Sequence, residues 1–168
     1  MKNIVLIGMM GSGKTTCGRL LAQRLDRAFV DCDELIEQFT GRTIPEIFET
    51  DGEDAFRGLE SQVIREVSAQ RDLVVATGGG AVLRQANVAA LRKNGVTVFL
   101  DRPVEDILAG VSMAGRPLGQ GTAEQFRATF ALRLPAYRTA ADVMVFDFSD
   151  PAATVDEILA KLAALPKR

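Results

Sequence analysis

Residues 8–15, Gly-Met-Met-Gly-Ser-Gly-Lys-Thr, have the types and spacing of a phosphate-binding loop. They fit the P-loop template G-x-x-x-x-G-K-[ST], whose glycines let backbone N–H groups close around a phosphate. In that template Lys14 reaches the β- and γ-phosphates of a nucleotide, and the Thr15 hydroxyl binds magnesium. A glycine turn could match by chance, but an apolar run precedes this one and a helical pattern follows it. We therefore predict that the loop holds phosphates at the start of a helix.

Two carboxylates, Asp31 and Asp33, follow a second apolar run. Ligands bind at the carboxyl ends of parallel strands in open α/β sheets, and side chains two positions apart on an extended chain point the same way. Close carboxylates repel unless a cation or donor compensates. Magnesium shared with the P-loop would compensate Asp31, which leaves Asp33 to accept hydrogen bonds from a substrate hydroxyl. Alternatively, Asp33 is only the N-cap of a helix that begins at Glu34.

Arg57 and Glu60 are three residues apart in a predicted helix and can pair. Spacing alone favours an ordinary surface pair, which contributes little stability. In the alternative, Glu60 orients Arg57 so that its planar guanidinium can bind a carboxylate in a bidentate manner. A later arginine, Arg133, lies in a helix that we expect Pro135 to end, and alone it would be a solvated residue.

The third apolar run leads into Thr77-Gly78-Gly79-Gly80. Glycines stabilise regular structure poorly, so either a ligand approaches the bare backbone here or the chain makes a tight turn. This strand does not end in the aspartate that many P-loop enzymes use for magnesium, and Asp31 is the natural substitute.

Residues 111–122 are rich in glycine and form the one irregular segment of the pattern. A connection of this length in an α/β protein is either a mobile lid or disordered. Because the segment contains a single arginine, Arg116, we favour the lid.

Helical and strand patterns alternate along the whole chain. Strands are predicted near residues 3–7, 28–31, 72–76, 96–100 and 142–146. Helices are predicted near residues 14–25, 33–40, 53–70, 84–93, 103–110, 123–137 and 151–164. This alternation is typical of a doubly wound parallel sheet with right-handed crossovers. Before the last helix, Asp150 is a plausible N-cap with Pro151 at the first helical position.

Length and composition fit one domain of a globular protein, residues 1–168. The net charge of −2 offers no electrostatic case for nucleic-acid binding. We found no apolar run long enough for a membrane span and no signal peptide, so we expect a soluble cytoplasmic protein. Histidine is absent, which excludes His-based triads and leaves acid–base work to carboxylates or lysine. The two cysteines, Cys17 and Cys32, are expected to be reduced and packed near the nucleotide.

Together these motifs resemble those of the shikimate kinase family over essentially the whole chain. The matching set is the P-loop, Asp31-Cys32-Asp33, Phe56-Arg57-x-x-Glu60, Gly78-Gly79-Gly80, Arg116-Pro117-Leu118 and Arg133-x-Pro135-x-Tyr137. The resemblance implies a three-layer α/β/α P-loop kinase fold with a five-stranded parallel sheet in the order 2-3-1-4-5. It also implies transfer of the γ-phosphoryl group of ATP to the 3-hydroxyl of shikimate, with one Mg²⁺ ion and a monomeric enzyme.

The resemblance also implies a role for each matching residue. The catalytic residues would be Lys14, Asp33 and Arg116. ATP would contact Gly11, Ser12, Gly13, Lys14, Thr15, Thr16, Arg116 and Pro151, and magnesium would bind Thr15 and Asp31. Shikimate would contact Asp33, Arg57, Glu60, Gly78, Gly79, Gly80 and Arg133, with both arginines on its carboxylate and Glu60 holding Arg57. The substrate-binding region would span about 33–61 and the lid about 111–123.

The chain departs from the family pattern near the adenine. Val111-Ser112-Met113 stands where relatives usually carry Arg-Thr, whose arginine stacks on adenine, and Arg138 is one candidate to replace it. The turn Phe146-Asp147-Phe148 is also more apolar than expected. Two alternatives remain open: another small-molecule P-loop kinase, acting on gluconate or a nucleoside monophosphate, and a catalytically silent nucleotide-binding module.

Overall fold

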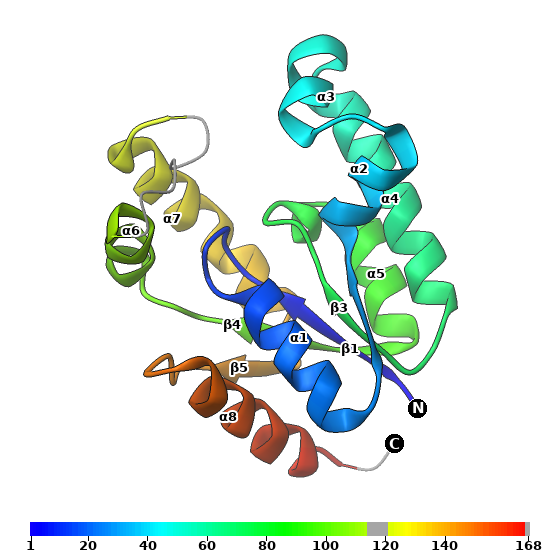
Figure 1. Ribbon diagram of the computed structural model, residues 1–168, viewed down its shortest axis with the longest axis vertical. Coiled ribbons are helices and arrows are strands. Elements are labelled where there is room, and N and C mark those ends of the chain that lie inside the picture. Colours follow the sequence, from blue (N-terminus) through cyan, green and yellow to red (C-terminus); the bar gives the residue numbers. More distant parts are fainter. Residues whose placement is uncertain (114–120, 167–168) are drawn as a thin grey trace.

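The computed structural model describes residues 1–113 and 121–166 of the chain (Figure 1). Its strands are β1 (Asn3–Ile7), β2 (Ala28–Asp31), β3 (Leu73–Ala76), β4 (Gly95–Leu100) and β5 (Val143–Val145). They form one sheet in the order β2-β3-β1-β4-β5, and every neighbouring pair is parallel. The helices are α1 (Lys14–Leu25), α2 (Cys32–Thr40), α3 (Ile44–Asp51), α4 (Glu53–Ala69), η1 (Ala81–Leu83), α5 (Gln85–Lys93), α6 (Val104–Met113), α7 (Ala123–Ala140) and α8 (Pro151–Ala163). The expected fold class and strand order are confirmed.

The central strand β1 is buried on both faces, as its uninterrupted apolar sequence predicts. Ile4 and Leu6 pack into a core that α1 and α8 cover. Val5 and Ile7 pack into a second core with α4, α5 and α7 on the opposite face. The sheet is therefore the middle of three layers, and the helices on its two faces can be followed in Figure 1.

Three expectations about local structure were wrong. The eight-residue helix α3 was not predicted, although Thr43 and Glu46 form a complete capping box at its start. Helix α7 continues through Pro135 to Ala140. The predicted irregular segment, residues 111–122, was wrong at its start, because α6 includes residues 111–113, whereas α7 begins at residue 123 as predicted.

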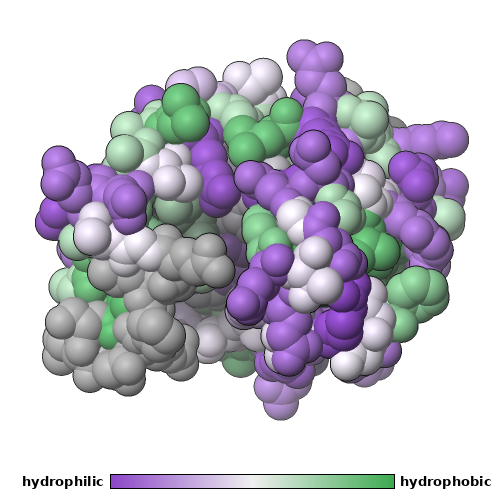
Figure 2. All heavy atoms as spheres, turned by 90° about the horizontal axis from the view of Figure 1, so that it is seen from above, coloured by the Kyte–Doolittle hydropathy of each residue, from purple (hydrophilic) through white to green (hydrophobic). Residues whose placement is uncertain are grey.

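The carboxyl ends of the parallel strands meet at one edge of the sheet, which we call the ligand edge. The P-loop, the Asp31 turn, the Gly78–Gly80 segment and the 146–150 turn all follow strands there. Beyond this edge, α2 and α3 project on one side and α6 with the start of α7 on the other (Figure 1). Figure 2 looks onto this edge and shows a recess between the two groups of helices. No helix in the described ranges is both long and apolar enough to cross a bilayer.

Candidate active site

The P-loop joins β1 to the first turn of α1 and has the backbone of an anion cradle. Gly11 and Gly13 have φ angles of +81° and +99°, a region that favours glycine. Gly13 is the N-cap of α1 and offers no side chain, so no side-chain oxygen caps the first N–H groups of the helix. A phosphate can take that place, and the positive end of the helix dipole favours it.

Lys14 lies inside the loop. Its Nζ donates hydrogen bonds to the carbonyl oxygens of Gly8 (2.7 Å) and Met9 (2.8 Å), and the residue is only 9% exposed. Burial lowers the Lys14 pKa to about 8, against the opposing effect of the Asp33 and Asp31 carboxylates. The loop therefore holds a positive charge that is shielded from water and that the site can direct to a phosphate.

Thr15 and Asp31 place two oxygen ligands side by side next to the P-loop. The Thr15 hydroxyl donates to Oδ2 of Asp31 at 2.9 Å. Oδ1 of Asp31 accepts from the backbone N–H groups of Asp33 (2.9 Å) and Glu34 (3.3 Å), which makes Asp31 the N-cap of α2. The N-cap alternative for Asp33 is therefore wrong, and its side chain is available to the site.

This pair of oxygens fits magnesium. Mg²⁺ prefers hard oxygen ligands and usually takes one or two protein groups together with substrate phosphates and water. Within the described residues no cluster of three or more His, Cys, Asp or Glu side chains forms a metal cage. Two protein oxygens beside a phosphate-binding loop are a donor set that fits an ion bound together with nucleotide phosphates.

The three glycines after β3 all face charged side chains. A Cβ atom at Gly78 would lie 2.6 Å from Oε2 of Glu60 and 2.9 Å from Oδ1 of Asp33. A Cβ atom at Gly80 would lie 2.6 Å from Nη1 of Arg57. Real Cβ atoms do not approach other atoms so closely, so a side chain at either position would displace these groups. The glycines let two carboxylates and a guanidinium contact the main chain.

Arg57 and Glu60 form an ion pair that is buried, so the surface-pair interpretation is wrong. Nη1 of Arg57 lies 2.8 Å from Oε1 of Glu60, and the two side chains are 13% and 1% exposed. Oε2 of Glu60 and Oδ1 of Asp33 are buried without a hydrogen-bond partner in the described part of the chain. Because both unpaired oxygens face Gly78, they are available to donors of a ligand bound there.

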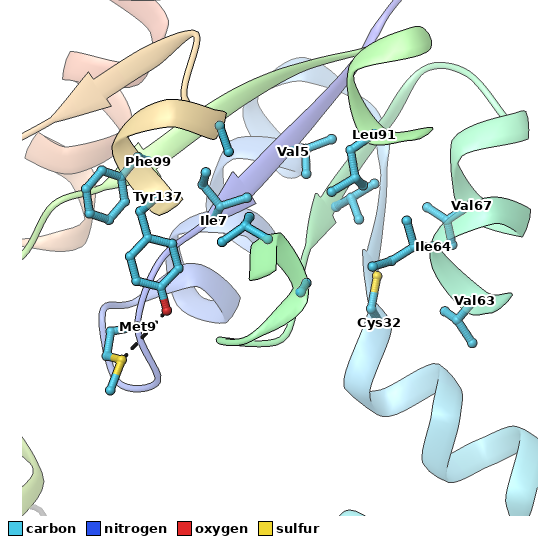
Figure 3. Close-up of a cluster of buried hydrophobic side chains, with 14 of the residues drawn as sticks. Val5, Ile7, Met9, Cys32, Val63, Ile64, Val67, Leu91, Phe99 and Tyr137 are labelled. Carbon is cyan, nitrogen blue, oxygen red and sulfur yellow. Dashed lines mark hydrogen bonds between the residues drawn. The ribbon is translucent and has the colours of Figure 1, made fainter. Parts of the chain in front are cut away.

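Arg133 reaches the same segment from α7. Its Nη1 lies 3.1 Å from the position of a Cβ atom at Gly79. Four residues later on the helix, the buried Tyr137 hydroxyl donates to the Gly79 carbonyl and also contacts Sδ of Met9 at 3.7 Å (Figure 3). The ring of Tyr137 stacks on Phe99 at 5.1 Å. Sequence reasoning gave Tyr137 no role, although its i, i+4 spacing from Arg133 places the two on one helical face.

Asp33 is poised to accept a proton near neutral pH. The Asp33 pKa is raised to about 6: burial has the largest effect, the Asp31 and Glu60 carboxylates also raise the pKa, and Lys14 and Arg57 partly oppose the shift. At pH 7 the group is therefore mostly ionised, yet a proton on it is more stable than on an ordinary aspartate.

The turn between β5 and α8 is fixed from both sides. Asp150 caps α8 through the Ala153 N–H (2.8 Å), with Pro151 as first residue, as expected. The Glu157 carboxylate accepts the backbone N–H groups of Phe146 (3.0 Å) and Asp147 (2.7 Å). The turn therefore presents a rigid surface at the ligand edge.

Three other expectations concern this side of the site. Arg116 lies outside the described residues. Arg138 is exposed in the last turn of α7, which returns the chain to the amino end of β5, so it lies near the sheet edge opposite the P-loop. It is therefore poorly placed to contact a nucleotide. Cys17 and Cys32 are both buried and unpaired, as expected for packed thiols.

A cavity of about 710 Å³ lies at this opposite edge, between the amino ends of β1 and β4 and the end of α8. Arg27 and Arg92 line it, but each is already paired with a carboxylate, Asp72 and Asp142 respectively. The convergent charges at the ligand edge make that edge the better candidate for chemistry.

Comparisons with known proteins agree with this geometry. The family model for shikimate kinase matches residues 10–163. A shikimate kinase from Symbiobacterium thermophilum is 46% identical over 166 residues, which cover 95% of each chain. The chain belongs to the shikimate kinase family. It is therefore an ATP-dependent kinase of the shikimate pathway.

Solved structures support the same assignment. The structure of shikimate kinase from Acinetobacter baumannii in complex with shikimate superposes with a TM-score of 0.90 at 39% identity, covering 98% of this chain and 94% of that one. A gluconokinase from Sinorhizobium meliloti reaches a TM-score of 0.65 at only 19% identity over 96% of this chain and 91% of that one, a likeness that shows the fold alone. Family membership thus favours shikimate kinase over the gluconate kinase alternative.

Proposed function

We propose that shikimate binds over Gly78, Gly79 and Gly80, with its carboxylate on Arg57 and Arg133. Glu60 holds Arg57 in place, and Asp33 accepts hydrogen bonds from the ring hydroxyls, including the attacking 3-hydroxyl. One observation carries this proposal: two arginines and two unpaired carboxylate oxygens converge on a backbone without side chains, next to the P-loop. Such a site matches a small ring with one carboxylate and several hydroxyls.

We propose a matching set of contacts for ATP. The phosphates would bind Gly11, Ser12, Gly13, Lys14, Thr15 and Thr16, while Pro151 would line the adenine. Thr15 and Asp31 would hold Mg²⁺, which when bound neutralises charge on the phosphates. Arg116 would join Lys14 at the transferring phosphoryl group as the 111–123 lid closes.

The chemistry then depends on positioning and charge, because phosphoryl transfer needs little covalent help from the protein. Lys14 stabilises the negative charge on the equatorial oxygens, in a site shielded from water. The 3-hydroxyl oxygen attacks the γ-phosphorus, ADP leaves, and the hydroxyl proton passes to Asp33.

A coupled ADP-release assay with shikimate, gluconate and AMP as acceptors tests the proposal. Of these three acceptors, we expect only shikimate to be phosphorylated. In Arg133→Ala, KM for shikimate should rise while KM for ATP stays unchanged, because the carboxylate contact lies away from the transferring group. Turnover of gluconate or AMP in place of shikimate, or unchanged kinetics in both Arg133→Ala and Asp33→Asn, would overturn it.

We further propose that residues 1–168 form one kinase domain, with the shikimate region at about 33–61, acting as a cytoplasmic monomer without nucleic-acid or membrane partners. One chain carries every residue that the mechanism invokes, and ATP is a cytoplasmic metabolite. Light scattering during size-exclusion chromatography tests the oligomeric state: full activity at concentrations where only monomer is present is the expected result.

A further inference from the structure

Arg102 is a cation at the ligand edge that has no partner among the described residues. It lies two residues after the end of β4, and its half-buried side chain makes no hydrogen bond or ion pair with the residues that the structure describes. The Nε atom is fully buried and has no acceptor within that part of the chain. Leaving a buried donor unpaired is unfavourable, so the position of Arg102 needs an explanation that the described neighbouring groups do not supply.

The neighbours of Arg102 place it beside the P-loop. Its Nη2 lies 3.8 Å from the position of a Cβ atom at Gly110, on α6. The same helix packs on the P-loop: a Cβ atom at Gly11 would lie 3.0 Å from Ile107. Burial raises the pKa of the Cys17 thiol, on the first turns of α1, while a hydrogen bond with Thr154 and the charge of Arg102 oppose this shift. Arg102 thus lies beside α6, close enough to α1 for its charge to act on Cys17.

The other side of the P-loop is already occupied by acceptor-binding groups. Asp33, Glu60 and Arg57 come from α2 and α4, which follow β2 and approach the glycines after β3. With phosphates on the P-loop, the nucleoside must therefore extend over the opposite half of the ligand edge, across β4 and β5. Arg102 and the rigid 146–150 turn are at that half.

We propose that Arg102 stacks its guanidinium on the nucleobase of ATP and thereby sets nucleotide affinity. A planar guanidinium stacks well on an aromatic face, and it is less strongly hydrated than an ammonium group. Gly110 makes this possible because a long side chain at that position would enter the space beside Arg102. This inference rests on the proposed nucleotide site and names a residue to which sequence reasoning gave no role.

Calorimetric titration of ADP into Arg102→Ala, Arg102→Lys and wild type tests the inference. We expect Arg102→Ala to weaken ADP binding on the order of tenfold. Arg102→Lys should restore little of the lost affinity, because an ammonium group carries the charge but has no planar surface that can stack on the base. Tripolyphosphate should bind all three proteins equally. The control is Arg138→Ala, which removes an exposed arginine at the opposite edge and should leave ADP affinity unchanged.

A second variant tests whether an arginine at position 110 can take the place of Arg102. Because a Cβ atom at Gly110 meets nothing closer than Nη2 of Arg102, Arg102→Ala with Gly110→Arg should fold and regain part of the lost ADP affinity. Equal weakening of ADP and tripolyphosphate in Arg102→Ala, full recovery in Arg102→Lys, or no recovery in the double variant would each overturn the inference.

The kinetics separate this inference from the proposed function. In Arg102→Ala, kcat at saturating ATP and KM for shikimate should match wild type. If wild type fails to phosphorylate shikimate while Arg102→Ala still loses ADP affinity, the proposed function fails and the inference stands. If wild type phosphorylates shikimate and Arg102→Ala binds ADP normally, only the inference fails.

Discussion

Asp33 and Lys14 have pKa values that bracket neutrality. Asp33 titrates at about 6 because of burial and two neighbouring carboxylates, and Lys14 at about 8 because of burial. We expect kcat/KM to fall below about pH 6, where protonated Asp33 no longer accepts, and above about pH 8, where free enzyme loses the Lys14 charge. A pH series of initial rates at low concentrations of ATP and shikimate measures both limbs. A flat profile between pH 5 and 7 would exclude Asp33 as the acceptor.

The same carboxylate costs stability. Its pKa is raised in the folded state, so the native protein binds the proton more tightly than the unfolded chain between about pH 4 and 6, and stability falls as pH rises through that window. Asp33→Asn removes the charge and should increase the free energy of unfolding by about 1–3 kcal/mol at pH 8 while abolishing activity. Denaturant unfolding at several pH values should show this gain shrinking from pH 6 towards pH 4. A gain that is the same at pH 4 and pH 8 would contradict the assignment.

At the scale of elements, strands and long helices were predictable because their patterns are local. The sequence did not predict α7 continuing through Pro135, because contacts of Phe126 and Tyr137 with the core outweigh the missing hydrogen bond. Ala131, whose carbonyl loses its donor, is exposed and can bind water instead.

The site was predictable in its motifs but not in its burial. Spacing identified Arg57 and Glu60 as a pair, yet only the packing of α4 against the glycines after β3 makes that pair buried. Such packing joins segments about twenty residues apart, and no local pattern reports it. The proposed nucleobase side was least predictable, since the position of Arg102 next to Gly110 of α6 joins segments that no local pattern connects.

Two glycines allow a matched test of that packing. Gly80→Ala places a methyl group 2.6 Å from Nη1 of Arg57 and should displace the guanidinium, raising KM for shikimate about tenfold or more, with KM for ATP unchanged. Gly58→Ala, next to Arg57 on α4, meets nothing within 4 Å. It should leave the kinetics unchanged and stabilise the helix by about 0.5–1 kcal/mol. Steady-state kinetics and thermal unfolding of both variants provide the comparison; similar kinetics in the two would count against the proposed clamp.

At the scale of the whole molecule, the two proposed substrate sites meet at the P-loop. The proposed acceptor-binding groups come from α2, α4 and the glycines after β3, and Arg133 reaches them from α7; the proposed nucleotide-binding groups come mainly from the P-loop and the β4–β5 half of the ligand edge. Each ligand should therefore stabilise the fold through its own set of contacts. Either one at a hundred times its Kd contributes about 2.7 kcal/mol, which corresponds to a rise in Tm of about 5–10 °C for a chain of this size.

Single substitutions should remove these stabilising effects independently. Arg133→Ala should lose most of the Tm increase with shikimate, at the concentration that stabilises wild type, and keep the increase with ADP. Lys14→Met should show the reverse, because its charge faces the phosphates rather than the clamp of Arg57 and Arg133. Differential scanning fluorimetry of both variants with each ligand gives the four values. If either substitution removes both increases, the two halves of the ligand edge fold or bind as one unit, and their assignment to separate substrates is wrong.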